Sequence, residues 1–357
     1  MNRPTCNTPD GDAYLDIQKL AKADGRSTDE LLALYALEGF HDRLSSSSRA
    51  DDLVLKGGVL LAAYDTRRPT RDIDLQATHL VGDPDTVLAL VRDIAAAHKD
   101  DGLVYDAGSA TAEVIRDEEE YSGVRVRLSA HLSRARIPFH VDVNVGDPIV
   151  PPPGQVEVPR LLGGVITVRG YPLSMVFAEK IVTAVQRGTV NTRWRDYADI
   201  ALLSAAHDID GDELAASIDV VATHRNATLT PLDEVLAGYA DIAQNKWSAW
   251  VRKQRLTDRL DQDFAGVLQD VFTFAGPALS GAIKGLRGFT ASGVGRPMTT
   301  PKQGQPSPHR GRSGSSRLTS RRYAMPPYCV HGIHPRLRLR PPGADIRRRL
   351  GGPLAET

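Results

Sequence analysis

Apolar residues at helical spacing begin the chain and predict two helices between residues 14 and 44. The break between them falls near Asp24-Gly25. Ser27 or Thr28, each just ahead of acidic residues, is typical of the start of the second helix. Residues 1–12 precede this pattern, and we expect them to be frayed.

Shorter apolar runs rich in β-branched residues follow and predict buried strands. These runs cover residues 53–56, 72–75, 124–132 and 136–145, with a helix predicted over residues 85–98. The mixture of strand and helix periods predicts an α+β fold, whose N-terminal module is a mixed sheet flanked by helices.

The clearest boundary is Pro151-Pro152-Pro153-Gly154, because three prolines cannot continue a helix or a central strand. Beyond it, residues 156–158 and 165–168 predict a short strand pair, and helical periodicity then dominates. After Gly288 the sequence is rich in Gly, Ser, Pro and Arg without periodicity, which is typical of disorder. The expected division is an N-terminal module at 13–150, a mainly helical C-terminal domain at 151–288 and a disordered basic tail at 289–357.

The formal net charge of zero hides a strong asymmetry. Residues 291–357 contain twelve Arg and one Lys against one Asp and one Glu, a net charge of +11, so the other 290 residues carry −11. An acidic body argues against binding duplex nucleic acid over a broad surface, although a local basic groove still suits an RNA end.

Only two cysteines are present, Cys6 and Cys329, which offer neither a disulfide framework nor a zinc site. No apolar run approaches the ~18 residues of a membrane span, and the N-terminus lacks the apolar core of a signal peptide. We therefore expect a cytoplasmic protein with no membrane partner.

Two aspartates separated by one aliphatic residue supply the first candidate chemistry. In Asp72-Ile73-Asp74 the period of two along a strand sends both carboxylates to one side, where they can share metal ions. Upstream, Gly57 and Gly58 lack Cβ atoms, so the backbone can approach a triphosphate and offer N–H groups to it. Each signal alone is more often structural, because Asp-x-Asp pairs are common in turns and Gly-Gly is an ordinary loop signal.

A third carboxylate, Asp142, lies inside the apolar run 136–145 between two valines. An ionised carboxylate is costly to bury unless it is paired or binds a metal. The other two aspartates and a metal would supply such a partner. The alternative is that Asp142 caps a loop or pairs with a neighbouring arginine such as Arg134 or Arg136. The joint pattern of Gly-Gly, Asp-x-Asp and strand Asp favours the metal site.

The downstream helices add charged candidates. Lys180 lies in an apolar stripe, so it either snorkels at the core margin or reaches a cleft and neutralises triphosphate charge. In the next helix Asp196 and Asp199 are three apart and share a face. They suit a nucleotide site, or equally a surface ladder with Arg193 and Arg195.

Together these residues resemble the nucleotidyltransferase fold of the DNA polymerase β-like superfamily, and more narrowly the AbiEii/AbiGii toxin family, the toxin half of bacterial toxin–antitoxin pairs. The resemblance covers residues 50–205 and rests on Lys56-Gly57-Gly58, Arg71-Asp72-Ile73-Asp74-Leu75, Pro172–Ile181 and Arg193–Leu203. This chain has Val59 where many relatives place Ser or Thr, so a hydroxyl contact to phosphate is missing.

The resemblance implies a magnesium-dependent enzyme with two Mg²⁺ ions, Mn²⁺ being an alternative. Asp72, Asp74 and Asp142 would bind the metals and, with Lys180, form the catalytic set. Nucleotide binding would involve Lys56, Gly57, Gly58, Arg71, Lys180, Arg193, Asp196 and Asp199. The implied reaction moves NMP from a nucleoside triphosphate to an RNA acceptor, the tRNA 3′ end, which blocks translation. The implied protein partner is a cognate antitoxin.

Two rival functions remain open. One is a nucleotidyltransferase that modifies a small molecule or a protein hydroxyl, which differs only in its acceptor pocket. The other is a non-catalytic nucleotide-binding or RNA-binding module with the basic tail as its active part. The presence of all three candidate carboxylates weakens this second reading.

Overall fold

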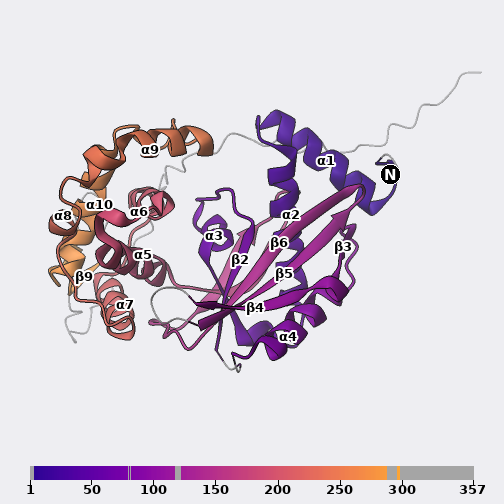
Figure 1. Cartoon of the computed structure of the whole chain (residues 1–357), viewed down its shortest axis with the longest axis horizontal. Coiled ribbons are helices and arrows are strands. Elements are labelled where there is room, and N and C mark those ends of the chain that lie inside the picture. The colour runs from indigo at the N-terminus through magenta and orange to yellow at the C-terminus, as the bar shows by residue number, and fades with distance from the viewer. Residues whose placement is uncertain (1–3, 79, 81, 117–121, 288–295, 298–357) are drawn as a thin grey trace, which may run out of the picture. The chain divides into compact units, whose positions relative to one another are not determined.

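The computed structural model describes residues 4–78, 80, 82–116, 122–287 and 296–297 (Figure 1). These residues lie within one compact unit that spans Met1–Thr300. The predicted tail at 289–357 lies outside the described residues, apart from Arg296 and Pro297.

Two helices open the chain, as the periodicity predicts: α1 (Pro9–Ala23) and α2 (Thr28–Ser45), with Ser27 at the N-cap of α2. The prediction that residues 1–12 are frayed is wrong for residues 9–12. The Thr8 side chain accepts a hydrogen bond from Gly11 N, and Pro9 occupies the first helical turn, so α1 starts earlier than its apolar stripe.

A mixed sheet of eight strands follows, and with the helices it confirms the predicted α+β class. The strands are β1 (Leu53–Lys56), β2 (Asp72–Ala77), β3 (Leu103–Tyr105), β4 (Thr111–Arg116), β5 (Ser122–Leu132), β6 (Ala135–Val145), β7 (Gly154–Pro159) and β8 (Val165–Gly170). Their order is β3-β5-β6-β2-β1-β8-β7, with β4 also paired to β5. The β2–β6 and β1–β8 pairs are parallel, and the other pairs are antiparallel.

The two faces of the central strands differ in polarity. Ile73 and Leu75 on β2 and Val141 and Val143 on β6 are fully buried, and α2 packs on β6 while α4 (Pro84–Ala96) packs on β4 and β5. The alternate residues of the same strands are polar and lie on the opposite face. Burial of the apolar face therefore fixes which side of the sheet carries the aspartates.

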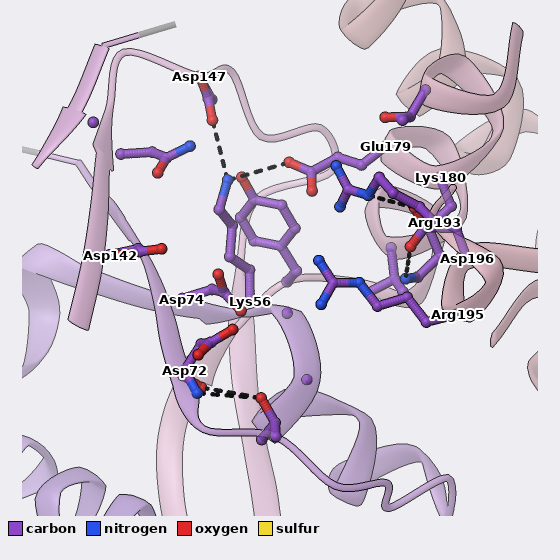
Figure 2. A pocket seen from close by; sticks show the side chains of 18 of the residues that line it. Lys56, Asp72, Asp74, Asp142, Asp147, Glu179, Lys180, Arg193, Arg195 and Asp196 are labelled. Carbon is purple, nitrogen blue, oxygen red and sulfur yellow. Dashed lines mark hydrogen bonds and ion pairs between the residues drawn. The ribbon is translucent and has the colours of Figure 1, made fainter. Parts of the chain in front are cut away.

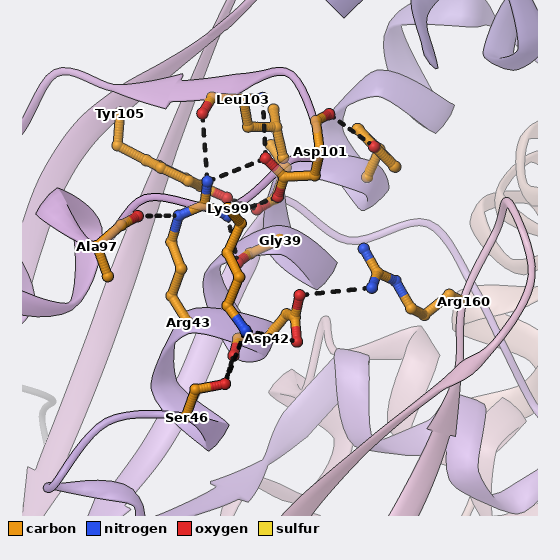
Figure 3. A network of polar contacts seen from close by, with 12 residues as sticks. Gly39, Asp42, Arg43, Ser46, Ala97, Lys99, Asp101, Leu103, Tyr105 and Arg160 are labelled. Atoms are coloured by element: carbon orange, nitrogen blue, oxygen red, sulfur yellow. Dashed lines mark hydrogen bonds and ion pairs between the residues drawn. The ribbon is translucent and has the colours of Figure 1, made fainter. Parts of the chain in front are cut away.

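Asp101 and Arg43 hold α2 against the loop that enters β3 (Figure 3). The Arg43 guanidinium is 1% exposed and donates to both Asp101 carboxylate oxygens at 2.6 and 3.0 Å. It also donates to the Ala97, Gly39 and Leu103 carbonyl groups. A buried charge satisfied in this way is stable, so this network is structural.

The strand pair predicted after the proline run is present as β7 and β8, which join the same sheet through β1. The division into domains at residue 150 stays a prediction. Helices then dominate, as predicted: α5 (Leu173–Arg187), α6 (Trp194–Ala206), α7 (Gly211–His224), α8 (Leu232–Val235), α9 (Tyr239–Gln254) and α10 (Phe264–Leu279), and a four-residue helix, α3 (Gly57–Leu60), follows β1. No helix in the described ranges is both long and apolar enough to cross a membrane.

Candidate active site

A cavity of about 340 Å³ opens between the polar face of the sheet and helices α5 and α6 (Figure 2). The sheet side contributes carboxylates from β2 and β6, and the helix side contributes lysine and arginine side chains. Eight basic and six acidic side chains line it in all. The cavity therefore joins an acidic wall to a basic one.

The three predicted aspartates lie on the acidic wall. Asp74 on β2 and Asp142 on β6 are direct neighbours in the parallel ladder, and Asp72 pairs in the same way with His140. Neighbours in register point to the same face, so Asp72, Asp74 and Asp142 all reach the cavity. The structure thus brings together residues that are seventy positions apart in the chain.

Asp142 is bound by a residue that the sequence analysis did not single out. Arg125 lies opposite it on β5 and donates Nε to Oδ1 at 2.8 Å and Nη2 to Oδ2 at 2.7 Å. The hydrogen bonds that Arg125 donates to Asp142 raise the pKa of Arg125. Arg136 is six residues from Asp142 on an extended strand, about 20 Å away, and Arg134 instead donates to the Tyr14 hydroxyl.

Asp72 and Asp74 have weaker partners. His140 Nε2 lies 3.0 Å from Asp72 Oδ1 and 3.8 Å from Asp142 Oδ2. Asp74 forms no ion pair with any residue in the described ranges, and burial raises the pKa of its carboxyl group, with Lys56 opposing this and Asp142 and Asp72 adding to it. Its oxygens are consequently available to a ligand from outside the chain.

The glycine pair closes the floor of the site. Gly57 has φ +68°, which L side chains rarely adopt, and a Cβ there would stand 1.9 Å from Asp74 Oδ2. Gly58 also lines the cavity, at the start of α3. Glycine at position 57 is therefore required both by the backbone and by the aspartate.

Lys56 is buried, and two carboxylates already bind its ammonium group. Its Nζ is 3.2 Å from Asp147 Oδ2 and 3.5 Å from Glu179 Oε1, so it joins β1 to α5. Burial lowers the pKa of Lys56, but the Glu179 and Asp147 carboxylates outweigh it, and the net shift is upward. The charged Lys56 side chain thus connects the sheet side of the cavity to the helix side.

Lys180, on α5, is held on the basic wall by two carboxylates of α6. Its Nζ lies 3.0 Å from Asp196 Oδ1 and 2.8 Å from Asp199 Oδ2. Arg193 binds Asp196 at 2.8 Å, and Arg68 binds Asp199 at 3.3 Å. Both aspartates are 1% exposed, so they form no surface ladder; they position three cations.

The basic wall keeps a positive potential despite these acids. Burial raises the pKa of Asp196, yet Lys180, Arg193 and Arg195 outweigh burial and bring the pKa down to about 2. Arg195 points into the cavity, and its guanidinium has no hydrogen bond or ion pair with the rest of the described chain. An incoming anion therefore meets an available guanidinium beside Lys180.

Two of the predicted site residues, Arg71 and Asp199, do not line the cavity. Arg71 is exposed, and Asp199 lies behind Lys180. Seven charged lining residues were not among the predicted site residues: Arg68, Arg125, Asp147, Glu179, Arg187, Arg195 and Arg225. Arg125 had a sequence signal, since Val124-Arg125-Val126-Arg127 alternates with period two, but the partner of Arg125 depends on strand register.

Carboxylate oxygens are the ligands that Mg²⁺ prefers, and Asp72 and Asp74 present them side by side on one face. These two residues therefore fit one magnesium ion. In the described ranges no group of three or more Asp, Glu, His or Cys side chains is gathered as a metal site, and Asp142 already has both oxygens bound by Arg125.

On this mixed sheet, the glycine turn and the aspartate pair lie in one cavity with Lys180. The chain belongs to the AbiEii family: a family model described as "Nucleotidyl transferase AbiEii toxin, Type IV TA system" matches residues 40–270. Membership confirms the resemblance seen in the sequence, and it implies a nucleoside triphosphate substrate and an antitoxin partner.

Two solved structures are similar to the chain. JHP933 from Helicobacter pylori is 12% identical, with 69% of this chain and 98% of that chain covered and a TM-score of 0.29. A second H. pylori protein, described as a nucleotidyltransferase, is 12% identical, with 63% and 98% covered and a TM-score of 0.29. Comparison with curated proteins gave no match.

Proposed function

We propose that this chain is a magnesium-dependent toxin that transfers NMP from a nucleoside triphosphate to the 3′ end of an RNA. The observation that carries the proposal is that Asp72 and Asp74 from the sheet and Lys180 from α5 line one cavity. The proposed acceptor is tRNA, whose blocked 3′ end would stop translation. The proposed place of action is the cytoplasm, where both substrates occur.

The acidic wall would bind the metal. Asp72 and Asp74 would hold Mg²⁺, which when bound neutralises triphosphate charge and favours departure of pyrophosphate. Gly57 packs against the Asp74 carboxylate, Gly58 follows it at the start of α3, and both glycines line the cavity. Their main-chain N–H groups would donate to phosphate oxygens.

The basic wall would bind the triphosphate. Lys180 is held in place by Asp196 and Asp199, and it loses little conformational entropy when it contacts a phosphate. Arg195 adds a planar guanidinium suited to phosphate oxygens. Mutual positioning of the two walls is the main contribution of the chain, because phosphoryl-type transfer needs charge stabilisation and alignment more than covalent chemistry.

An RNA acceptor is supported by charge. Arg187 and Arg225 also line the cavity and add to its basic side chains. A polyanionic end would gain from these charges, whereas a neutral small molecule would not. This favours RNA over the rival acceptors, a small molecule or a protein hydroxyl.

The proposal is tested by measuring whether a radiolabelled nucleotide is transferred to RNA. Each α-³²P-labelled ribonucleoside triphosphate is incubated with the full chain, Mg²⁺ and total RNA, and the RNA is then resolved by size. We expect label on the tRNA fraction from one or two nucleotides and a loss of at least about 100-fold in Asp72→Ala. Asp93→Ala, an exposed aspartate on α4, is the matched control and should transfer normally.

Label on protein or on a small molecule would replace the RNA acceptor by one of the rivals. Equal label with wild type and Asp72→Ala would contradict the catalytic role of the aspartates, and binding of RNA without any transfer would favour the non-catalytic module.

A further inference from the structure

Asp74 and Asp142 are neighbours on the sheet, but their carboxylates have different surroundings. Asp74 lies against the Gly57 backbone and has no ion pair in the described ranges. Asp142 has each oxygen bound by a different nitrogen of one guanidinium. The metal-binding capacity of the two residues therefore differs.

The Arg125–Asp142 contact is built into the sheet. The two residues are direct partners in the antiparallel β5–β6 ladder, so their side chains leave the same face at adjacent points. The pair is a side-on fork through Nε and Nη2 at 2.8 and 2.7 Å, and such two-pronged contacts are among the strongest that arginine forms with carboxylates. The side chains are 28% and 12% exposed, so solvent screens the pair only in part.

A divalent ion at Asp142 would compete directly with this guanidinium. It would need at least one oxygen that Arg125 now binds, and it would lie within a few ångströms of a cation that stays charged at any relevant pH. The Arg125 guanidinium on β5 therefore opposes a second metal at Asp142.

We propose that the Arg125 guanidinium takes the place of a second metal ion at Asp142, so that this chain binds a single Mg²⁺, through Asp72 and Asp74, when nucleotide is present. This inference rests on the proposed function and sharpens it: one divalent ion and one fixed arginine face the triphosphate. Arg125 supplies positive charge without ligand exchange, because a guanidinium offers donors in a fixed plane and no coordination sites.

The decisive measurement is the number of ions bound. The full chain, stripped of metal with EDTA, is titrated with Mn²⁺ at saturating α,β-methylene nucleoside triphosphate, each of the four bases in turn. Free Mn²⁺ is followed by electron paramagnetic resonance. We expect one ion per chain in the wild type. We also expect one ion in Asp142→Asn and no chain-bound ion in Asp72→Asn.

Removing the guanidinium should open the second site. Arg125→Gln is expected to bind two ions, and the double variant with Asp142→Asn is expected to return to one. The matched control is Arg127→Ala, two residues along the same strand face, where the arginine pairs with exposed Glu113 instead. This control should bind one ion, like the wild type.

Two ions in the wild type, with one lost in Asp142→Asn, would overturn the assignment. So would a single ion in a folded Arg125→Gln. The wild-type count needs no variant, so a variant that fails to fold leaves the assignment open to refutation. Two ions together with normal transfer would refute only the role of Arg125, whereas no nucleotide-dependent ion and no transfer would refute the proposed function itself.

Discussion

A Cβ atom at Gly57 would stand 1.9 Å from Asp74 Oδ2, so the glycine backbone and the aspartate carboxylate occupy adjacent space with no room for a methyl group. The contact joins the turn after β1 to the middle of β2. It places the glycine turn directly beside a candidate metal ligand.

Gly57→Ala should therefore impair transfer more than stability. A non-glycine residue at φ +68° costs about 1–2 kcal/mol, and displacement of Asp74 by about 1 Å should lower transfer by about 100-fold. Urea unfolding and label transfer measure the two effects. The control is Gly163→Ala, where φ is +95° and nothing lies within 4 Å, so strain occurs without collision. Transfer within about twofold of wild type in Gly57→Ala would contradict the role of this contact.

Substitution of Lys180 should lower transfer activity more than substitution of Asp199. Lys180→Met leaves two buried carboxylates without their shared cation, which should destabilise the fold by about 3–5 kcal/mol and abolish transfer. Asp199→Asn leaves Lys180 bound to Asp196, so we expect only partial loss of kcat/KM. Lys246→Ala, an exposed residue of α9, is the control. Equal losses in the two site variants would mean that Asp199 does more than hold Lys180.

Alanine substitution of Arg195, which lines the cavity, should affect KM more than alanine substitution of Arg71, which lies at the surface. Arg195→Ala removes a guanidinium that points into the cavity and has no hydrogen bond or ion pair within the described part of the chain. KM for the nucleotide should rise by about 5-fold to 30-fold, since charge-assisted contacts contribute about 1.5–3 kcal/mol before screening. Arg71→Ala should leave KM within about twofold, because Arg71 is exposed and outside the cavity lining. The reverse order would restore the sequence-based prediction for Arg71.

His41 should make stability depend on pH. Burial lowers the pKa of this α2 histidine from 6.5 to about 4, and neither ring nitrogen has a hydrogen-bond partner among the residues that the structure describes. Because the pKa is lower in the folded state, the unfolded chain takes up the proton first as pH falls. Stability is then lost between pH 6.5 and 4, by about 3 kcal/mol at most. His41→Leu should remove this part of the pH dependence in urea unfolding, and exposed His98→Leu should not.

Much of the site followed from local chemistry. Alternation put Asp72 and Asp74 on one face of a strand, and both line the cavity. Helical spacing put Lys180 at a core margin, which left two readings, and the structure shows the lysine in the cavity wall. Period and polarity are properties of a short segment, so the sequence alone specifies them.

The partner of Asp142 could not be predicted from local sequence patterns. Arg134 and Arg136 are closer in sequence, but the hairpin between β5 and β6 sets a register in which Arg125 is the cross-strand neighbour. Asp196 and Asp199 suited a solvated ladder equally well until the packing of α5 on α6 buried them. Neither outcome depends on any pattern within a single element.

By itself the sequence determined the α+β class, the strand face that carries the aspartates and the membership of the AbiEii family, because hydrophobic period and motif spacing are local. Only the tertiary structure decided which charges meet: Arg125 with Asp142, Lys56 with Asp147 and Glu179, and Lys180 with Asp196 and Asp199. Electrostatic partners act over a few ångströms in space, and strand register and helix packing place residues at that distance regardless of their separation along the chain.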